Sequence, residues 1–295
     1  MTSRKVHFRH LRVSATIGEL SPLQLRESFY LKRGIWNSVA GMGSGLEDRV
    51  GLITGAGSGV GREMAKLFAE RGCKVVVVDV IPERVNQVVS EIGTSGGKAT
   101  GMVLDLSLES EVERMVEDSF SAYGKIDILC NNAGIMDGVK PVAETSDELW
   151  EGVLNINLNA PFWASRRVIP IMLKQGNGII LNTASVAGVF GGKAGAAYTV
   201  SKHGLIGLTK SIAASYGAKG IRCNAMVLGA VQTAIGVGSK EPSPLGMDIL
   251  NKTAALIPRM AEPKEIAKLA LFLASDDSSY LNGSCVVADG GWTIY

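Results

Sequence analysis

Apolar, strand-like runs alternate with amphipathic, helix-like segments from Arg49 to the end of this chain. Seven short apolar runs are predicted as strands, at 50–54, 74–79, 100–104, 127–131, 178–183, 221–227 and 284–289. Because consecutive parallel strands need a crossover, usually a helix, this order constrains the topology strongly. It predicts an α/β fold, a Rossmann-type doubly wound, seven-stranded parallel sheet with helices on both faces.

The segments between the strands show helical spacing of apolar residues, as at Val112, Met115 and Val116. Helices are predicted at 61–72, 84–93, 107–124, 147–176 and from 196 to about 218. The stretch 234–260 breaks this rhythm, and its glycines and prolines indicate a loop of the kind that often forms a lid.

Composition separates the chain into two parts. We predict one globular domain over residues 46–295, because a chain of 295 residues with 46% hydrophobic residues can bury a large core. Residues 1–45 are predicted as an N-terminal extension, rich in arginine and poor in acids. Two alternatives stay open for it: a transit-like segment, or an upstream extension of a chain that starts near Met42.

Several classes of function are disfavoured. The net charge is +2, and the part after residue 45 carries no basic stripe, which argues against a nucleic-acid partner. No apolar run approaches the roughly 20 residues of a membrane span. The four cysteines form no CxxC, and no His/Cys cluster suggests a metal site. We expect buried free thiols in the cytoplasm, or in a mitochondrial or other organelle matrix if residues 1–45 direct transit.

A glycine-rich turn joins the first predicted strand to the first helix. It reads TGxxxGxG, with Gly55, Gly59 and Gly61 around Ser58 and Val60. Glycines here let the backbone approach a pyrophosphate, whose charge the helix N-terminus favours. The turn therefore predicts a dinucleotide site rather than a plain tight turn.

Two acids end the second and third predicted strands. Asp79 is placed to hydrogen-bond the adenosine ribose and to repel a 2′-phosphate, which favours NAD over NADP; its alternative is to cap the helix near Pro82. Asp105, next to Leu106, contacts adenine or serves as a helix cap, as Ser107 could, and both interpretations stay open.

Tyr198 and Lys202 lie four residues apart on a predicted helix, so their side chains meet. They could simply pack together. Alternatively, a cation about 4 Å from the phenolate contributes about 4 kcal/mol at an effective dielectric of about 20. That energy would lower the tyrosine pKa by about 3 units, into the range of a general acid or base.

Three further sequence features lie between the glycine turn and the end of the tyrosine-lysine helix. Asn132, Ala133 and Gly134 belong to an NNAG segment, Asn157 follows on the long helix, and Ser185 precedes Tyr198 by 13 residues. Together with the glycine turn, Asp79 and the Tyr-Lys pair, the chain from about Leu46 onward resembles the short-chain dehydrogenase/reductase family in its classical, single-domain, NAD-preferring form.

This resemblance implies roles for four residues. Tyr198 would exchange a proton with the substrate oxygen, and Ser185 would donate a hydrogen bond to that oxygen. Lys202 would lower the tyrosine pKa and bind the nicotinamide ribose, and Asn157 would anchor a water chain. The NNAG segment would stabilise the sheet beside the adenine-ribose side of the cofactor.

The loop after the sixth strand carries further candidates. The family usually has Pro-Gly here, and Leu228 replaces the proline, so the loop loses a fixed φ angle. Val231 and Thr233 match positions that contact the nicotinamide amide and phosphate. The candidate substrate residues are Ser185 and a mostly apolar set, Met136, Val189, Phe190, Leu228 and Ile235. They suggest an uncharged, fairly apolar substrate.

Four polar residues near these motifs are predicted to have structural roles. Asn155 and Asn159 are expected on the other side of the helix from Asn157, and His203 is expected at the surface or in packing. Arg259 is expected to pair with Glu262 or Glu265 rather than to bind a carboxylate substrate.

The predicted function is NAD(H)-dependent interconversion of a secondary alcohol and a ketone. The alternatives are a 3-oxoacyl-[acyl-carrier-protein] reductase and, from another class, a non-catalytic nucleotide-binding regulator. By resemblance, the two long helices are expected to form the interface of a homotetramer or homodimer.

Overall fold

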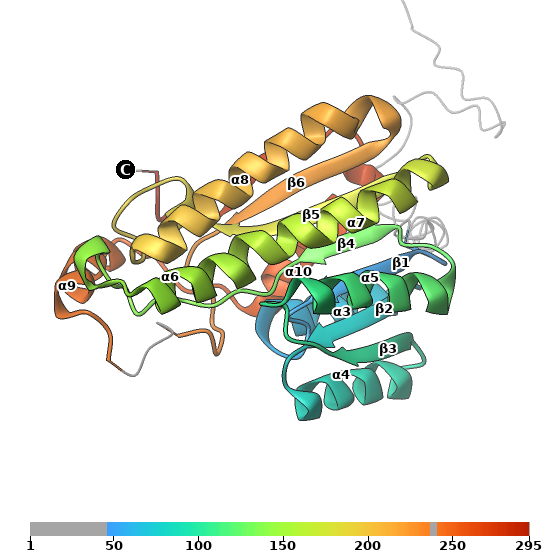
Figure 1. The fold of residues 1–295 in the computed structure, drawn as a ribbon, viewed down its shortest axis with the longest axis horizontal. Coiled ribbons are helices and arrows are strands. Elements are labelled where there is room, and N and C mark those ends of the chain that lie inside the picture. The colour runs from blue at the N-terminus through green and yellow to red at the C-terminus, as the bar shows by residue number, and fades with distance from the viewer. Residues whose placement is uncertain (1–45, 237–240, 295) are drawn as a thin grey trace, which may run out of the picture. The chain divides into compact units, whose positions relative to one another are not determined.

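The computed structural model describes residues 46–236 and 241–294, and one parallel sheet runs through them (Figure 1). Its strand order is β3-β2-β1-β4-β5-β6-β7. The strands are β1 (Val50–Thr54), β2 (Lys74–Asp79), β3 (Lys98–Val103), β4 (Ile128–Asn131), β5 (Gly178–Ser185), β6 (Ile221–Leu228) and β7 (Cys285–Ala288). The order reverses direction between β1 and β4, which makes this a doubly wound sheet and confirms the predicted fold class. The predicted extension, residues 1–45, lies outside the described residues.

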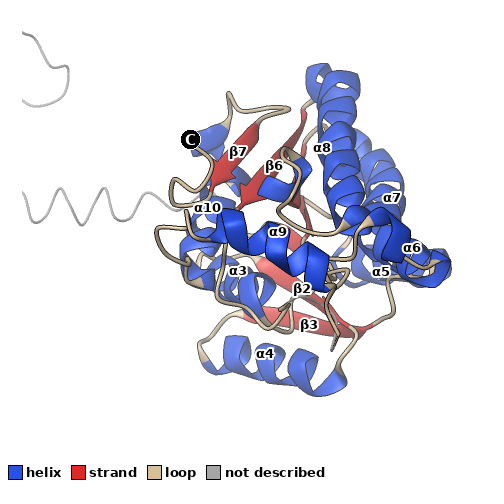
Figure 2. Ribbon diagram, turned by 90° about the vertical axis from the view of Figure 1, so that its left-hand side faces the viewer, coloured by secondary structure: helices blue, strands red, loops and turns tan. Residues whose placement is uncertain are grey.

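Helices cover both faces of the sheet (Figure 2). One layer holds α3 (Gly59–Glu70), α4 (Pro82–Thr94) and α10 (Pro263–Ala274), and the other holds α5 (Glu109–Tyr123), α7 (Ala160–Gln175) and α8 (Ala196–Tyr216). The helices α6 (Asp147–Leu154) and α9 (Pro244–Ala254) lie toward the carboxyl ends of the strands (Figure 1). Short 3-10 turns lie at Val142–Glu144, Val186–Gly188, Gly217–Lys219 and Asp276–Ser278.

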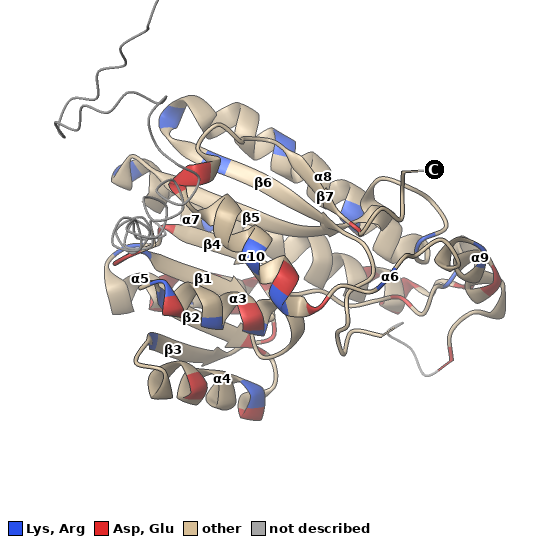
Figure 3. Cartoon of the chain, turned by 180° about the vertical axis from the view of Figure 1, so that it is seen from behind, with Lys and Arg blue, Asp and Glu red and all other residues tan. Residues whose placement is uncertain are grey.

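The core consists of a layer of apolar side chains on each face of the sheet. Val75 and Val77 of β2 face α3 and α4, whereas Val76 and Val78 face the α5 side. All four are fully buried, as expected for a β-branched strand covered on both faces. Charged residues lie mainly on helices and loops, with both signs interspersed over the part of the chain that is described (Figure 3).

The long helix predicted over 147–176 is not continuous. Residues Asn155–Asn159 form a π-helical turn between α6 and α7. The side chain of Asn157 is fully buried there and hydrogen-bonds the main chain of Ile135. A π turn inserts one extra residue and redirects the side chains around it, and such turns are frequent at functional sites.

The predicted loop at 234–260 contains a helix. The glycines and prolines of this stretch predict irregular backbone, yet Pro244 occupies the first turn of α9, as Pro263 does in α10. Proline suits this position because its missing N–H would have no intrahelical partner. Ser243 caps α9 by accepting a hydrogen bond from the Gly246 N–H at 3.1 Å.

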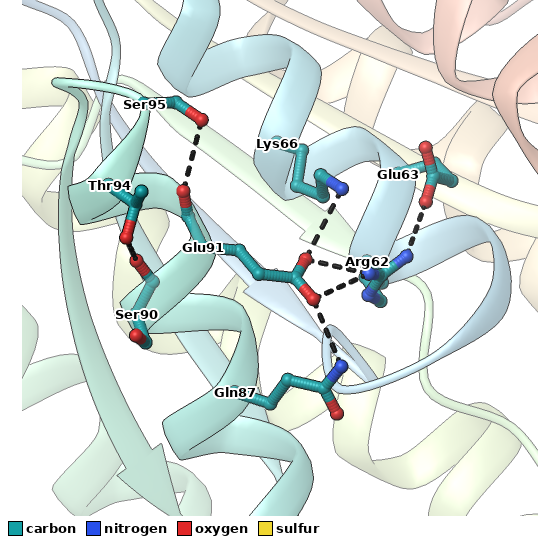
Figure 4. Close-up of polar contacts among 8 residues, drawn as sticks. All are labelled: Arg62, Glu63, Lys66, Gln87, Ser90, Glu91, Thr94 and Ser95. Carbon is teal, nitrogen blue, oxygen red and sulfur yellow. Dashed lines mark hydrogen bonds and ion pairs between the residues drawn. The ribbon is translucent and has the colours of Figure 1, made fainter.

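A polar cluster links α3 to α4 (Figure 4). The Glu91 carboxylate accepts two hydrogen bonds from Arg62, at 2.6 and 2.7 Å, and one from Gln87 at 3.0 Å. Lys66 adds an ion pair with Glu91 at 3.2 Å. These contacts lower the pKa of Glu91 to about 2, chiefly through the hydrogen bonds from Arg62. The cluster thus braces the two helices that follow β1 and β2.

Candidate active site

The glycine turn between β1 and α3 is as tight as the sequence requires. Gly55 and Gly59 have φ angles of +62° and +53°, in the left-handed region that favours glycine. A Cβ on Gly61 would lie 2.2 Å from the carbonyl oxygen of Gly55. Ser58 is the N-cap residue of α3, and Val60 is buried in its first turn. The turn therefore presents backbone at the start of a helix, the arrangement that binds a pyrophosphate.

Asp79 lies against this turn at the end of β2. Its Oδ2 accepts a hydrogen bond from the Gly57 N–H at 3.0 Å, and its Oδ1 accepts one from the Ile81 N–H at 3.1 Å. The residue is 8% exposed. The carboxylate thus holds the glycine turn and the residue before α4 together. It does not cap the helix, because the N-cap of α4 is Ile81 without a side-chain hydrogen bond, and its contact with the ribose stays a prediction.

The NNAG segment fastens β4 to the glycine turn through Thr54. The Thr54 hydroxyl accepts hydrogen bonds from the N–H groups of Asn132 and Ala133, at 3.0 and 3.1 Å. The Asn132 amide donates to the Thr54 carbonyl at 3.0 Å. Thr54 was not among the predicted site residues, although a threonine directly before the first glycine of the motif could have indicated it.

Asp105 and Leu106 lie at the neighbouring strand end, after β3. Asp105 is exposed, and its carboxylate accepts from the Ser107 N–H at 2.9 Å. The N-cap of α5 is Leu108, without a side-chain hydrogen bond, so the interpretation of Asp105 or Ser107 as the cap is wrong. Leu106 is buried in the core beneath this turn.

The loop after β6 returns to the glycine turn. Val231 forms a parallel bridge with Ala261, and a Cβ on Gly59 would lie 3.1 Å from Cγ2 of Thr233. An open cleft of about 450 Å³ is lined by Gly59, Thr233 and Met260, among other residues. Val231 and Thr233 therefore belong to the same corner of the fold as the glycines, although they are far away in the sequence.

Tyr198 and Lys202 share the first two turns of α8, and both are buried. The Lys202 Nζ donates to the Thr183 carbonyl at 2.7 Å and lies 5.4 Å from the centroid of the Tyr198 ring. A Cβ on Gly134 would lie 3.3 Å from Asn157 Oδ1 and 3.5 Å from Lys202 Nζ. The lysine, the asparagine and the NNAG segment therefore meet at the carboxyl edge of the sheet.

Burial dominates the proton affinities of this pair. It raises the pKa of Tyr198 to about 12; a hydrogen bond with Ser185 lowers that pKa, and the charge of Asp137 raises it. Burial also lowers the pKa of Lys202 to about 8. Burial therefore outweighs any lowering of the Tyr198 pKa by Lys202 in this arrangement, and that role of Lys202 stays a prediction. The ammonium lies over the ring and bonds a carbonyl, while burial penalises the phenolate.

Asn157 and Ser185 are also placed beside the pair. The Asn157 amide accepts from the Ile135 N–H at 2.8 Å, and donates to the Ile135 carbonyl at 2.9 Å and to the Ser201 hydroxyl at 3.2 Å. The Ser185 hydroxyl accepts from the Ala187 N–H at 3.1 Å. Asn157 therefore connects the π turn, the loop after β4 and α8. Its anchoring of a water chain stays a prediction.

The predicted substrate residues divide into two groups. Met136 packs against the buried cluster that includes Tyr198, and Phe190, Val189 and Ile235 are between 42% and 46% exposed. Leu228 is different, because it is 6% exposed and packs in the core beside α10. Its side chain is part of the fold's interior rather than of the exposed apolar rim, contrary to the prediction of a pocket position.

The helix α9, named the lid helix because it lies in the segment predicted as a lid, contacts the loop that joins β5 to α8. The Thr253 hydroxyl hydrogen-bonds the Gly192 carbonyl at 3.5 Å, and the Trp292 indole donates to the Thr253 carbonyl at 2.8 Å. Lys193 Nζ lies 4.2 Å from the centroid of the Trp292 ring. The C-terminal segment thus holds the lid and the loop together.

The residues predicted to have structural roles have them. Arg259 forms two hydrogen bonds of 2.7 Å with Glu265. The exposed His203 bonds the Thr199 carbonyl, and Asn159 bonds Asn155. The cysteines are free thiols, and Cys73, Cys130 and Cys223 are buried. In the described part of the chain, no helix combines the length and apolar character needed to cross a membrane.

These features define a class: a doubly wound, dinucleotide-binding fold with a tyrosine, a lysine, a serine and an asparagine gathered at the carboxyl edge of its sheet. Comparison with known proteins gives the family. Residues 55–293 match the family model described as enoyl-(acyl carrier protein) reductase. The chain belongs to the short-chain dehydrogenase/reductase family of oxidoreductases.

Three similar proteins illustrate the range of the family. The 3beta-hydroxysteroid dehydrogenase 2 of Eggerthella lenta is 39% identical, over 85% of this chain and 96% of that protein. The cyclohexanol dehydrogenase of an Acinetobacter species is 37% identical, over 85% and 98%. The crystal structure of a putative NAD(P)-dependent gluconate 5-dehydrogenase from Beutenbergia cavernae, with bound NADP, has a TM-score of 0.76 at 35% identity, covering 86% of this chain and all of that one.

Proposed function

We propose that this protein interconverts a secondary alcohol and a ketone with NAD(H), and that Tyr198 is the general acid and base. The observation that carries the proposal is the position of Tyr198. Its buried ring lies with Lys202 and Ser185 at the sheet edge that also holds the glycine turn and Asp79. Ligands of doubly wound sheets bind at this carboxyl edge, where the strand order reverses.

The residues around the glycine turn fit a dinucleotide. Gly59 and Gly61 leave backbone unobstructed at the start of α3, where a side chain on Gly61 would collide with the turn itself. The Asp79 carboxylate would accept hydrogen bonds from the adenosine ribose and repel a 2′-phosphate, which favours NAD. When bound, the cofactor supplies the hydride acceptor or donor. Because the Beutenbergia cavernae relative holds NADP, the preference needs a direct test.

The proton is handled by three side chains. With a pKa of about 12, Tyr198 carries its proton near neutral pH and can donate it to a substrate oxygen during ketone reduction. In alcohol oxidation the phenolate must form, and a protonated Lys202, whose Nζ lies 5.4 Å from the centroid of the ring, would stabilise it. Ser185 would donate a hydrogen bond to the same substrate oxygen, holding it where negative charge develops.

The substrate we propose is an uncharged, alicyclic secondary alcohol or its ketone. Three of the residues predicted to contact the substrate, Val189, Phe190 and Ile235, are exposed apolar side chains. Arg259, the arginine considered for a carboxylate, is already paired with Glu265. Two of the similar proteins are named for a hydroxysteroid and for cyclohexanol, both of which carry a secondary alcohol on a ring.

The test measures NADH formation from NAD over a panel of cyclic and open-chain secondary alcohols, repeated with NADP. Turnover is expected with NAD and a cyclic alcohol, and Tyr198→Phe is expected to abolish it while NADH still binds. The control His203→Ala removes an exposed side chain from the same helix and should keep wild-type rates. Preference for NADP and 3-oxoacyl thioesters would support the carrier-protein reductase instead. NADH binding without any turnover would support a nucleotide-binding regulator.

We also propose that the chain forms a homo-oligomer through α7 and α8. Phe162 and Val200 on these helices are 44% and 45% exposed, so a contact between copies through this face would bury their apolar side chains. Sedimentation equilibrium should show a dimer or tetramer, and Phe162→Glu should shift it toward smaller species. A wild-type monomer at micromolar concentration would refute this proposal.

A further inference from the structure

Asp137 is a buried carboxylate close to Tyr198, and it is not among the predicted site residues. It follows the NNAG segment in the loop after β4, and its side chain is fully buried. Within residues 46–236 and 241–294 it forms no ion pair. A buried, unpaired carboxylate is costly unless hydrogen bonds satisfy it, so its partners indicate why it is there.

The partners of Asp137 are backbone N–H groups at the start of the catalytic helix. Its Oδ2 accepts from the Tyr198 N–H at 2.9 Å, and its Oδ1 accepts from the Gly195 N–H at 3.1 Å and the Val139 N–H at 3.1 Å. The Lys140 carbonyl accepts from the Ala196 N–H at 2.9 Å. The N-cap residue of α8 is Gly195, which has no side chain to cap with. Asp137 therefore supplies the cap from about 60 residues earlier in the sequence.

The close approach of the two segments depends on Gly195. A Cβ at this position would lie 2.5 Å from Asp137 Oδ2 and 2.5 Å from the Lys140 nitrogen. The φ angle of Gly195 is −78°, so the glycine is needed for space rather than for backbone conformation. The N-terminal turn of α8 is thus seated directly on the loop 137–140.

The same loop seats the lid helix on its other side. The Ser243 N–H, at the N-cap of α9, donates to the Gly138 carbonyl at 3.0 Å. A Cβ on Gly246 would lie 1.8 Å from the Val139 carbonyl oxygen, so α9 also touches the loop at its first turn. Val139 has a φ of +55°, unusual for a β-branched residue, and its N–H is held by Asp137.

We propose that Asp137 is a positioning residue, which fixes the first turn of α8, and therefore Tyr198, and ties it to the loop on which the lid helix α9 rests. This inference rests on the proposed function of Tyr198. A displacement of about 1 Å at a catalytic group can cost about 100-fold in rate, so a cap that holds Tyr198 in place matters to turnover. Movement of the lid would reach the tyrosine through the same carboxylate.

The first variant is Asp137→Asn, which keeps the shape but turns an NH₂ group toward one of the backbone N–H donors. We expect kcat to fall about 10- to 100-fold, with the KM for NAD unchanged because the glycine turn is untouched. Hydrogen exchange of the full-length protein, followed by mass spectrometry, should rise at both 195–198 and 244–254. The matched control is Ser146→Ala, which removes the N-cap of α6. It should raise exchange at the start of α6 alone and keep wild-type kcat.

A second variant keeps the carboxylate and decides the matter if Asp137→Asn does not fold. Gly195→Ala pushes against both the carboxylate and the Lys140 backbone without removing the charge of Asp137, and the same fall in kcat and the same rise in exchange at both segments are expected. Wild-type kcat in a folded variant would overturn the positioning role. Increased exchange at 195–198 without any change at 244–254 would overturn the tie to the lid. A wild-type protein that turns over no alcohol would refute the proposed function, while the exchange data would still decide the tie.

Discussion

The position of Asp79 leads to a prediction that joins the stability of the glycine turn to the choice of cofactor. Its two carboxylate oxygens accept from two different backbone donors, Gly57 at 3.0 Å and Ile81 at 3.1 Å. Asp79→Asn has nearly the same shape but offers one oxygen and one NH₂ group. Whichever way the amide turns, its NH₂ faces an N–H that can no longer donate.

The magnitude follows from this lost hydrogen bond. An unsatisfied buried donor costs about 1–3 kcal/mol, and about 1 kcal/mol moves the Tm of a domain of this size by about 2–4 °C. A fall in Tm of several degrees is therefore expected. If the carboxylate also accepts from the ribose, losing a charged hydrogen bond of about 1.5–3 kcal/mol weakens NADH binding about 10- to 100-fold. Affinity for NADPH should fall less, because the repulsion of its 2′-phosphate is also removed.

The assay combines thermal unfolding with titration of NADH and NADPH by calorimetry. Asp118→Asn is a matched control, because Asp118 is exposed on α5 and its replacement also removes one negative charge. It should leave both the Tm and the two affinities unchanged. An Asp79→Asn protein with wild-type Tm and wild-type NADH affinity would refute both parts of the reasoning.

Three further outcomes are expected. Burial lowers the pKa of Lys202 to about 8. The folded state therefore releases this proton at a lower pH than the unfolded state does. The free energy of unfolding consequently rises by about 2 kcal/mol from pH about 7.5 to about 9.5. Urea unfolding of Lys202→Met should lack this rise. Glu91→Gln should lower the free energy of unfolding by about 1 kcal/mol at neutral pH, a modest amount because solvent screens the ion pair with Arg62. This loss should vanish as the pH falls toward about 2, where Glu91 becomes protonated, and a loss that is independent of pH would contradict the reasoning. Trp292→Phe loses the hydrogen bond to Thr253, so limited proteolysis within α9 should accelerate. Unchanged cleavage would argue against the C-terminal segment holding α9 in place.

Much of the fold could be predicted because its signals are local and periodic. A strand such as 74–79 is a run of β-branched residues, and a parallel sheet buries such strands on both faces. The order of strands and helices then limits the topology to a few arrangements. Strand ends were less predictable: β3 begins at Lys98 rather than at residue 100, because pairing with β2 sets its length.

Features that depend on distant partners could not be predicted in the same way. The π turn at Asn157 is linked to bonds with Ile135 and Ser201, and the helix α9 is held by Gly138 and Trp292 through contacts far apart in the sequence. Proline and glycine near α9 suggested irregular backbone, since the pattern alone does not show which residues the first helical turn will meet.

The tyrosine-lysine pair shows most clearly what the sequence determines and what the tertiary structure determines. The sequence by itself determined that Tyr198 and Lys202 share one face of a helix, because a spacing of four residues does so in any α-helix. Only the tertiary structure decided their proton affinities, since burial raises one pKa and lowers the other whatever the local spacing. The tertiary structure also placed Asp137 at the start of their helix. Local periodicity fixes what lies along one element, whereas packing between elements decides solvation and charge.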